Sequence, residues 1–291
     1  MRSSAIVFLA AFIALSASWA GFVLAPQLQL GRAPLEKSLG TETLYPVARP
    51  GLAAQGAEVY TALGCVYCHS QQVGQDGVRC DIVLSEPGTN VLATLAALRS
   101  VDENLGKPET LANLPKVIKT VATVAAADAI VKPLRETGAK AGVKIVPTGS
   151  DISRGWGRRR TVAQDYAYDL PVQLGTRRAG PDLADVGARQ PDIEWHLRHL
   201  YDPKSEVKDS TMPPYRFLFE ERPAGKSDPA DVLALPAGAA PAGKEIVKTD
   251  AARALAAYLV SLRTTDVPLQ EAPFTPPPAP PAAPATNSAA Q

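Results

Sequence analysis

The sequence of 291 residues predicts an all-α protein, in which a single N-terminal transmembrane helix precedes a small helical domain. Three observations support this prediction. The chain begins with a long uncharged run, three later segments repeat apolar residues at helical spacing, and no run alternates convincingly with a period of two. The length allows one or two domains.

The uncharged run covers residues 3–25. As a helix it would reach about 35 Å, which is enough to cross a hydrocarbon core of about 30 Å. We expect residues 1–25 to be a retained anchor. A cleaved signal is the alternative, because the small residues Ser18 and Ala20 fit a cleavage site. In both cases the rest of the chain is exported.

Residues 26–50 hold four prolines and no apolar period, so we expect an extended linker there. Residues 51–263 are expected to form the main domain, and residues 264–291, rich in Pro and Ala, a disordered tail. Residues 223–243 resemble a surface loop. Helices of the domain are predicted at 52–63, between Pro191 and Pro203, and from Thr249 or Asp250 to Leu262.

Residues 74–150 differ from the rest of the domain and are interpreted as an insertion. They are rich in Ala, Val and Lys and contain no His, Met, Trp or Tyr. Helical patches are predicted at about 90–99 and 115–136. No residue pattern in this insertion indicates chemistry, so the insertion is expected to be partly helical and without a site.

Composition excludes several classes of function. Lys and Arg total 30 and Asp and Glu total 29, so the net charge of +1 gives no reason to expect a nucleic-acid partner. Three Cys cannot form a disulfide framework for a chain of this length, and three Cys with three His cannot fill several zinc sites. Since Met1 is the initiator, Met212 is the remaining methionine.

Cys65, Cys68 and His69 form a C-x-x-C-H motif, which is typical of covalent attachment of a c-type haem. Two thiols at this spacing can add to the two vinyl groups of one porphyrin, and the histidine then binds the iron. A thioredoxin-like pair would need a βαβ context, and a zinc site would need a second pair where only Cys80 remains. Cys80 is expected to be a lone thiol.

Met212 is the candidate for the second axial ligand of the iron. It stands among polar residues and is followed by Pro213 and Pro214, which stiffen an extended turn. His196 and His199 are rivals, because they share a helix face at i, i+3 and could give a bis-His haem. Their more ordinary role would be a hydrogen-bonded place beside Trp195 and Tyr201.

Residues 154–160 combine four Arg with Trp156 and form a basic, aromatic segment. It can be a solvated face, a subunit interface, or a guanidinium partner for haem propionates. Residues 180–183, with the sequence GPDL, predict a tight turn ahead of a helix.

Together these motifs resemble the membrane-anchored mono-haem cytochrome c subunit (subunit II, FixO/CcoO family) of cbb-type cytochrome c oxidases. The segments that carry the resemblance are 56–73, 154–187, 195–203, 210–220 and 256–263. The resemblance implies a class I cytochrome c-like domain with one covalent haem c, bound through Cys65 and Cys68. It also implies that His69 and Met212 are the axial ligands and that the carbonyl of Pro181 accepts the Nδ1 proton of His69. Gly56 would let the first helix cross the last one near Tyr258.

The implied function is relay of electrons through this haem to the catalytic subunit of a haem-copper terminal oxidase, without catalysis by this chain. Implied partners are that subunit, other cytochrome c subunits, and an upstream cytochrome or quinol-oxidising complex. The implied location is the bacterial inner membrane, with the haem domain on the periplasmic side. A free-standing periplasmic carrier is the alternative, and a haem-based sensor or enzyme with an open sixth position is a third reading.

The sequence departs from the family pattern at residues 74–150, where 77 residues intervene. The chain is therefore expected to belong either to a cbb-type oxidase, to a divergent oxidase, or to another membrane redox assembly.

Overall fold

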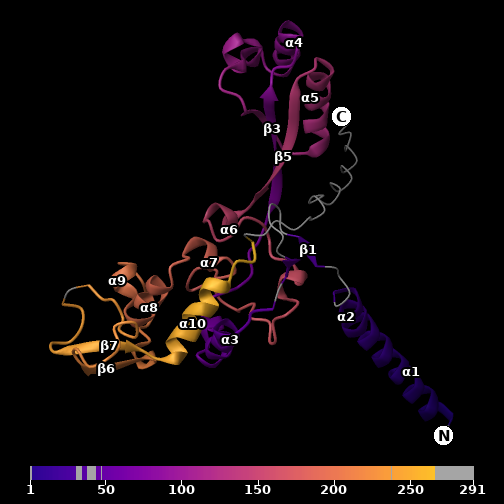
Figure 1. Ribbon diagram of the computed structural model, residues 1–291. Helices are drawn as coiled ribbons and strands as arrows, with labels where there is room; N and C mark the ends of the chain where they lie inside the picture. The colour runs from indigo at the N-terminus through magenta and orange to yellow at the C-terminus, as the bar shows by residue number, and fades with distance from the viewer. Residues whose placement is uncertain (1, 31–34, 38–43, 47, 237, 266–291) are drawn as a thin grey trace, which may run out of the picture. The chain divides into compact units, whose positions relative to one another are not determined.

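The computed structural model describes residues 2–30, 35–37, 44–46, 48–236 and 238–265 (Figure 1). Its chain divides into two compact units. The first, which we call the outer unit, comprises the described residues up to Gln75 and those from Ser150 to residue 265. The second is the inserted unit, Asp76–Gly149. Most of the predicted tail, residues 266–291, lies outside the described residues.

The prediction of an all-α fold is wrong. The described residues contain three antiparallel sheets, β1 with β2, β4-β3-β5, and β6 with β7. The fold is therefore mixed, with helices dominant in the outer unit and a sheet at the centre of the inserted unit.

The N-terminal helix fits the predicted anchor in length and composition. It consists of α1 (Arg2–Trp19), a π-helical stretch η1 (Ala20–Leu24) and α2 (Ala25–Leu30). Within the described residues one helix, Ser4–Gln29, is long and apolar enough to cross a membrane, with a mean hydropathy of 2.2.

The inserted unit is a three-stranded sheet with two helices, and β3 and β5 run side by side along it (Figure 1). The elements follow in the order β3 (Gly77–Glu86), α4 (Val91–Val101), η3 (Glu103–Gly106), η4 (Pro108–Leu111), β4 (Lys116–Val121), α5 (Val124–Glu136) and β5 (Lys140–Thr148). Cys80, Ile82 and Leu84 alternate along the central strand and are fully buried in one cluster with Leu98 and Leu134. This core explains the strands, because every second residue of β3 points to the same face.

Two features hid this sheet in the sequence. Val83 stands between Ile82 and Leu84 and obscures the alternation of β3. The helix predicted at about 115–136 is in fact β4 followed by α5, because Thr123 caps a new helix by accepting a hydrogen bond from the amide of Ala126.

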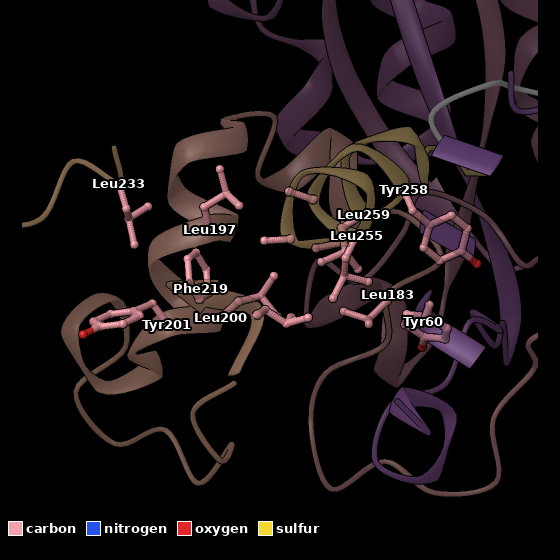
Figure 2. Close-up of a cluster of buried hydrophobic side chains, with 14 of the residues drawn as sticks. Tyr60, Leu183, Leu197, Leu200, Tyr201, Phe219, Leu233, Leu255, Tyr258 and Leu259 are labelled. Atoms are coloured by element: carbon pink, nitrogen blue, oxygen red, sulfur yellow. The ribbon is translucent and has the colours of Figure 1, made fainter. Parts of the chain in front are cut away.

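The outer unit is built around three helices near the predicted positions: α3 (Leu52–Ala62), α8 (Ile193–Tyr201) and α10 (Asp250–Ser261). Gly56 permits the close crossing of α3 and α10, since a Cβ at this position would lie 1.9 Å from the carbonyl oxygen of Ala254. Figure 2 shows the side chains that join α8 and α10 to the rest of the core, among them Leu197, Leu255 and Tyr258.

Short elements complete the outer unit. They are η2 (Cys65–Tyr67), α6 (Ser150–Ser153), η5 (Ala163–Tyr166), α7 (Val186–Arg189), α9 (Pro203–Glu206), η6 (Arg216–Leu218), β6 (Phe219–Pro223) and β7 (Lys244–Lys248). The pair β6–β7 is a second departure from an all-α fold. Leu233, within the loop that joins the two strands, is buried in the core (Figure 2).

The segment that follows the apolar helix is fastened to the outer unit. It contains β1 (Glu36–Lys37) and β2 (Leu44–Tyr45). The hydroxyl of Tyr45 donates to Asp165 at 2.7 Å, and Arg49 forms an ion pair with Asp169. The end of the predicted linker is therefore held against the loop that contains these two carboxylates.

Candidate functional site

The C-x-x-C-H motif lies on a tight turn directly after α3. Gly64 has a φ of 68°, a left-handed conformation that favours glycine and turns the chain from α3 into η2. The amide of His69 then donates to the carbonyl of Cys65 at 3.0 Å. All three cysteines of the chain are free thiols, with Cys65 half-buried, Cys68 exposed and Cys80 buried in the inserted unit. Two unpaired thiols and an imidazole are thus grouped on one turn.

The imidazole of His69 is held in one tautomer. Its Nδ1 lies 2.8 Å from the carbonyl oxygen of Pro181, the contact that the family resemblance implies. A carbonyl only accepts, so Nδ1 carries the proton and Nε2 keeps a lone pair for a metal. Burial lowers the pKa of His69, which favours the neutral ring that a metal needs.

Gly180 packs against the imidazole of His69, where only a residue without a side chain fits. A Cβ at Gly180 would lie 2.2 Å from Cε1 of His69, so a larger residue would displace the imidazole. The amide of Gly180 also donates to the carbonyl of Cys68 at 2.9 Å. The GPDL turn therefore does more than reverse the chain, because it packs directly under the motif.

Asp182 locks the motif and the turn together, and sequence reasoning did not single it out. It is fully buried and accepts from the hydroxyl of Ser70 at 2.5 Å and from the amide of Gln72 at 2.8 Å. Arg178 extends the network by donating to Ser70 at 2.9 Å and to Asp151 at 2.8 Å. The signal in the sequence was an acidic residue inside a turn that follows two arginines.

Met212 is part of an irregular segment that packs on the end of α8. The amide of Tyr215 donates to the carbonyl of Leu200 at 2.7 Å, and Met212 lies half-buried against the core of the outer unit. Burial and the nearby thiols of Cys65 and Cys68 raise the pKa of Tyr215. Met212, Tyr215 and Cys65 all pack against this same core.

The two histidines of α8 differ in their surroundings. His196 is buried, and its Nε2 lies 2.8 Å from the carbonyl of Gln190, so this nitrogen is the donor. His199 stacks on Trp195 with ring centroids 4.8 Å apart, and its Nδ1 is buried without a hydrogen-bond partner among the described residues. Burial lowers the pKa of both rings. His196 has a hydrogen-bonded place, whereas the environment of His199 includes an unpaired nitrogen.

The basic segment 154–160 contributes structure as well as surface. Arg159 is buried and forms two hydrogen bonds of 2.9 Å with Asp165, the carboxylate that Tyr45 also contacts. The guanidinium of Arg154 stacks on Trp156 at 4.9 Å from the ring centroid. Arg159 is thus engaged by Asp165 and does not face solvent.

Another arginine, Arg189 in α7, lies near His69 and was not singled out in the sequence. Its Nη2 donates to the carbonyl of Asp182, while its Nε is buried without a partner in the described part of the chain. Burial lowers the pKa of Arg189, and its charge in turn disfavours protonation of His69. An unpaired buried N–H donor beside this imidazole fits a carboxylate ligand.

These features fit a haem better than a metal bound by protein side chains alone. Among the described residues no three or more His, Cys, Asp or Glu side chains gather as a metal-binding group. A porphyrin supplies four ligands to its iron, so one imidazole and one thioether complete the coordination. A haem would use each of these groups. Cys65 and Cys68 have the spacing for its two vinyl groups, His69 Nε2 is available for its iron, and the unpaired Nε of Arg189 is available for a propionate.

A family model described as "Cytochrome C oxidase, mono-heme subunit/FixO" matches residues 143–265. The match includes Pro181, Met212, α8 and α10, and it confirms the family resemblance predicted from the motifs. No curated protein matches the chain. Over residues 143–265, the chain is therefore similar to the FixO family of mono-heme subunits of cytochrome c oxidase.

Proposed function

We propose that the chain is a membrane-anchored c-type cytochrome that relays electrons to the catalytic subunit of a haem-copper terminal oxidase. The observation that carries this proposal is the arrangement of two free thiols beside an imidazole whose Nδ1 is bound by Pro181. It occurs in a chain whose residues 143–265 match the model of a mono-heme oxidase subunit family. The apolar helix Ser4–Gln29 supports the anchor.

Four side chains of this chain would hold the haem. Cys65 and Cys68 would form the thioether bonds, and His69 Nε2 and the Met212 sulfur would be the axial ligands. When bound, the haem supplies a one-electron iron couple whose reduction potential is raised by a methionine opposite a histidine. Because His69 and Met212 would both hold the iron, the site would leave no position for oxygen.

The surrounding residues position these ligands. Pro181 fixes the orientation of the imidazole, and Asp182 holds the backbone after the motif through Ser70 and Gln72. Arg189 would donate its unpaired Nε–H to a haem propionate, which would balance a buried positive charge. The role of this chain is then to bind and orient a one-electron carrier in a fixed environment.

We place the haem domain on the periplasmic side of a bacterial inner membrane. The partners would be the catalytic subunit, other cytochrome c subunits of the complex, and an upstream cytochrome or quinol-oxidising complex as donor. This placement is supported by the oxidase family and by the apolar N-terminal helix.

A haem stain on a denaturing gel tests covalent attachment, and a stained band for the full chain is the expected result. In the ferric state, methionine ligation gives a weak absorption at the red end of the spectrum. This absorption should disappear in Met212→Ala and persist in His196→Gln and His199→Gln. If the wild type lacks it, a bis-His site replaces the proposed one.

Purification in detergent tests the place in an oxidase. We expect the chain to co-purify with a large multi-helix haem-copper subunit. A monomeric haem protein that leaves the membrane without detergent would instead identify a free-standing carrier.

A further inference from the structure

The segment after Asp165 has an inverted pattern of burial. Tyr168, Leu170, Val172 and Leu174 are all exposed, and Leu170 is 97% accessible, the highest value among the exposed large apolar residues of the described chain. The polar residues between them turn inward: Asp169 pairs with Arg49, and Gln173 is buried. Soluble segments usually bury the apolar members of such an alternation.

This exposure is imposed by the fold. The side-chain Nε2 of Gln173 donates to the hydroxyl of Thr61 at 2.6 Å, which fixes the segment against the end of α3. The hydroxyl of Tyr166 donates to the carbonyl of Gln71 at 2.6 Å, and the amide of Gln71 donates to the carbonyl of Leu174 at 3.0 Å. Because these hydrogen bonds hold the segment at both ends, it cannot rotate to bury its apolar side chains.

The same bonds place the segment beside the proposed haem attachment. Gln71 follows His69 closely, and the carbonyl of Val66, inside the C-x-x-C-H motif, accepts from the amide of Thr176 at 3.3 Å. Tyr67, also inside the motif, is 68% accessible. We use the name apolar edge for Tyr67, Tyr168, Leu170, Val172 and Leu174.

The apolar edge carries no free charge of its own. Between Tyr166 and Thr176 the single charged residue is Asp169, which is neutralised by Arg49. An exposed apolar patch of this kind marks an interaction site, and its contact would depend little on salt. It fits a partner with an uncharged, apolar surface.

The tether keeps the apolar edge within reach of the membrane. The apolar helix ends at Leu30, and Tyr45 is bonded to Asp165 at the start of the segment. The residues 31–44 between them span at most about 50 Å when fully extended. A membrane-embedded protein whose exposed surface lies within this distance of the membrane can therefore contact the apolar edge.

We propose that the apolar edge is the docking surface for a membrane-embedded redox subunit of the oxidase, which presents an uncharged, apolar face to it. This inference rests on the proposed function. A protein partner is favoured over lipid because the apolar edge borders the proposed haem-attachment motif. A redox subunit docked there would bring its own redox centre close to the haem, whereas lipid bound there would take no part in electron transfer.

Cysteine accessibility tests the docking surface in the full-length holoprotein. Leu170→Cys is compared with Leu92→Cys, whose parent side chain is 80% accessible on α4 of the inserted unit. The native background is low, since Cys65 and Cys68 would be bound to haem and Cys80 is fully buried. Each variant is treated with a maleimide, both in the detergent-purified complex and as the isolated chain in detergent.

We expect Leu170→Cys to react at least tenfold more slowly in the complex than in the isolated chain, while Leu92→Cys reacts equally in both. Equal reaction of Leu170→Cys in both states, or a wild type that retains no partner subunit, would overturn the proposal. A second variant pair, Leu170→Asp and Leu92→Asp, should lose and keep the partner subunit, respectively, during purification. Retention by both would also contradict it.

Two further outcomes identify other occupants and would likewise overturn the proposal. Protection of Leu170→Cys in the isolated chain, reconstituted in vesicles of phosphatidylethanolamine and phosphatidylglycerol, would indicate lipid. Protection in detergent that fades on dilution would indicate a second copy of the chain. The haem stain and co-purification separate the two hypotheses. A stained chain that retains the partner subunit but shows no protection refutes the docking surface alone, whereas an unstained wild type, or one without a partner subunit, refutes the proposed function.

Discussion

The outer unit and the inserted unit solve the problem of burying a core in different ways. In the outer unit, helices that are far apart in sequence meet, as when α3 crosses α10 over Gly56. In the inserted unit, neighbouring strands and helices close around β3. The chemistry follows the same division. All three His, Met212 and the C-x-x-C-H motif belong to the outer unit, and the inserted unit adds only a buried Cys80.

The way in which the insertion joins the chain explains this separation. Strands β3 and β5 are paired to their ends, at Gly77 and Thr148. On the outer side of that junction, the amide of Gly74 donates to Asp151 at 2.7 Å. The two points at which the outer unit joins the insertion are therefore adjacent, and a short loop could connect them.

The largest expected effect is a substitution at the helix crossing. In Gly56→Val, the new Cβ would meet the carbonyl of Ala254 at 1.9 Å and Cβ of Tyr258 at 2.6 Å. Backbone atoms cannot move aside as a side chain can, so we expect the outer unit to lose at least about 3 kcal/mol of stability. The haem-stained band should be strongly reduced, as measured on a denaturing gel against total protein.

The control is Gly142→Ala in β5, where a Cβ meets nothing within 4 Å. It should leave the stained band at the wild-type level. An undiminished band in Gly56→Val would mean that the two helices do not need this close approach.

The helices of the outer unit were predictable because their apolar residues repeat over three turns. The predictions at 52–63 and from Thr249 to Leu262 correspond to α3 and α10. The strands were not predictable in the same way. Strand β4 has six residues and leads directly into α5, so a window long enough to detect helical periodicity averages the two together. Short strands of this kind are fixed by tertiary contacts rather than by local preference.

The candidate site shows a similar split. Cys65, Cys68, His69 and Met212 follow from chemistry that residue type and spacing express. The contact of Pro181 with His69 came only from the family resemblance, since no local pattern brings together residues 112 positions apart. Arg159 and Arg189 show what residue type alone cannot predict. Arg159 pairs with Asp165, whereas Arg189 is the arginine that lies near His69.

A core substitution in the inserted unit should have an intermediate and local effect. Leu98 is fully buried on α4, so Leu98→Ala should cost about 3 kcal/mol through lost contacts and a cavity. Amide hydrogen exchange should accelerate throughout β3 and α5. The red-end absorption expected from the proposed Met212 ligation should not change, because the candidate site residues all lie in the outer unit.

Leu92→Ala on the same helix is the matched control. Its parent side chain is 80% accessible, so the stability should change by no more than about 0.5 kcal/mol. If Leu98→Ala instead abolished the red-end absorption, the two units would have to be coupled more tightly than their separate cores indicate.

The smallest effect should come from the largest change, removal of Asp76–Gly149 and its replacement by a short Gly-Ser linker. Gly74 and Asp151 are already bonded to each other, and Arg178 of the outer unit also bonds to Asp151, so the C-x-x-C-H motif keeps its supports without the insertion. We expect the haem stain and the red-end absorption to stay at wild-type levels. Loss of either in a well-expressed protein would show that the insertion supports the site, whereas their retention would direct the search for its role to assembly or partner binding.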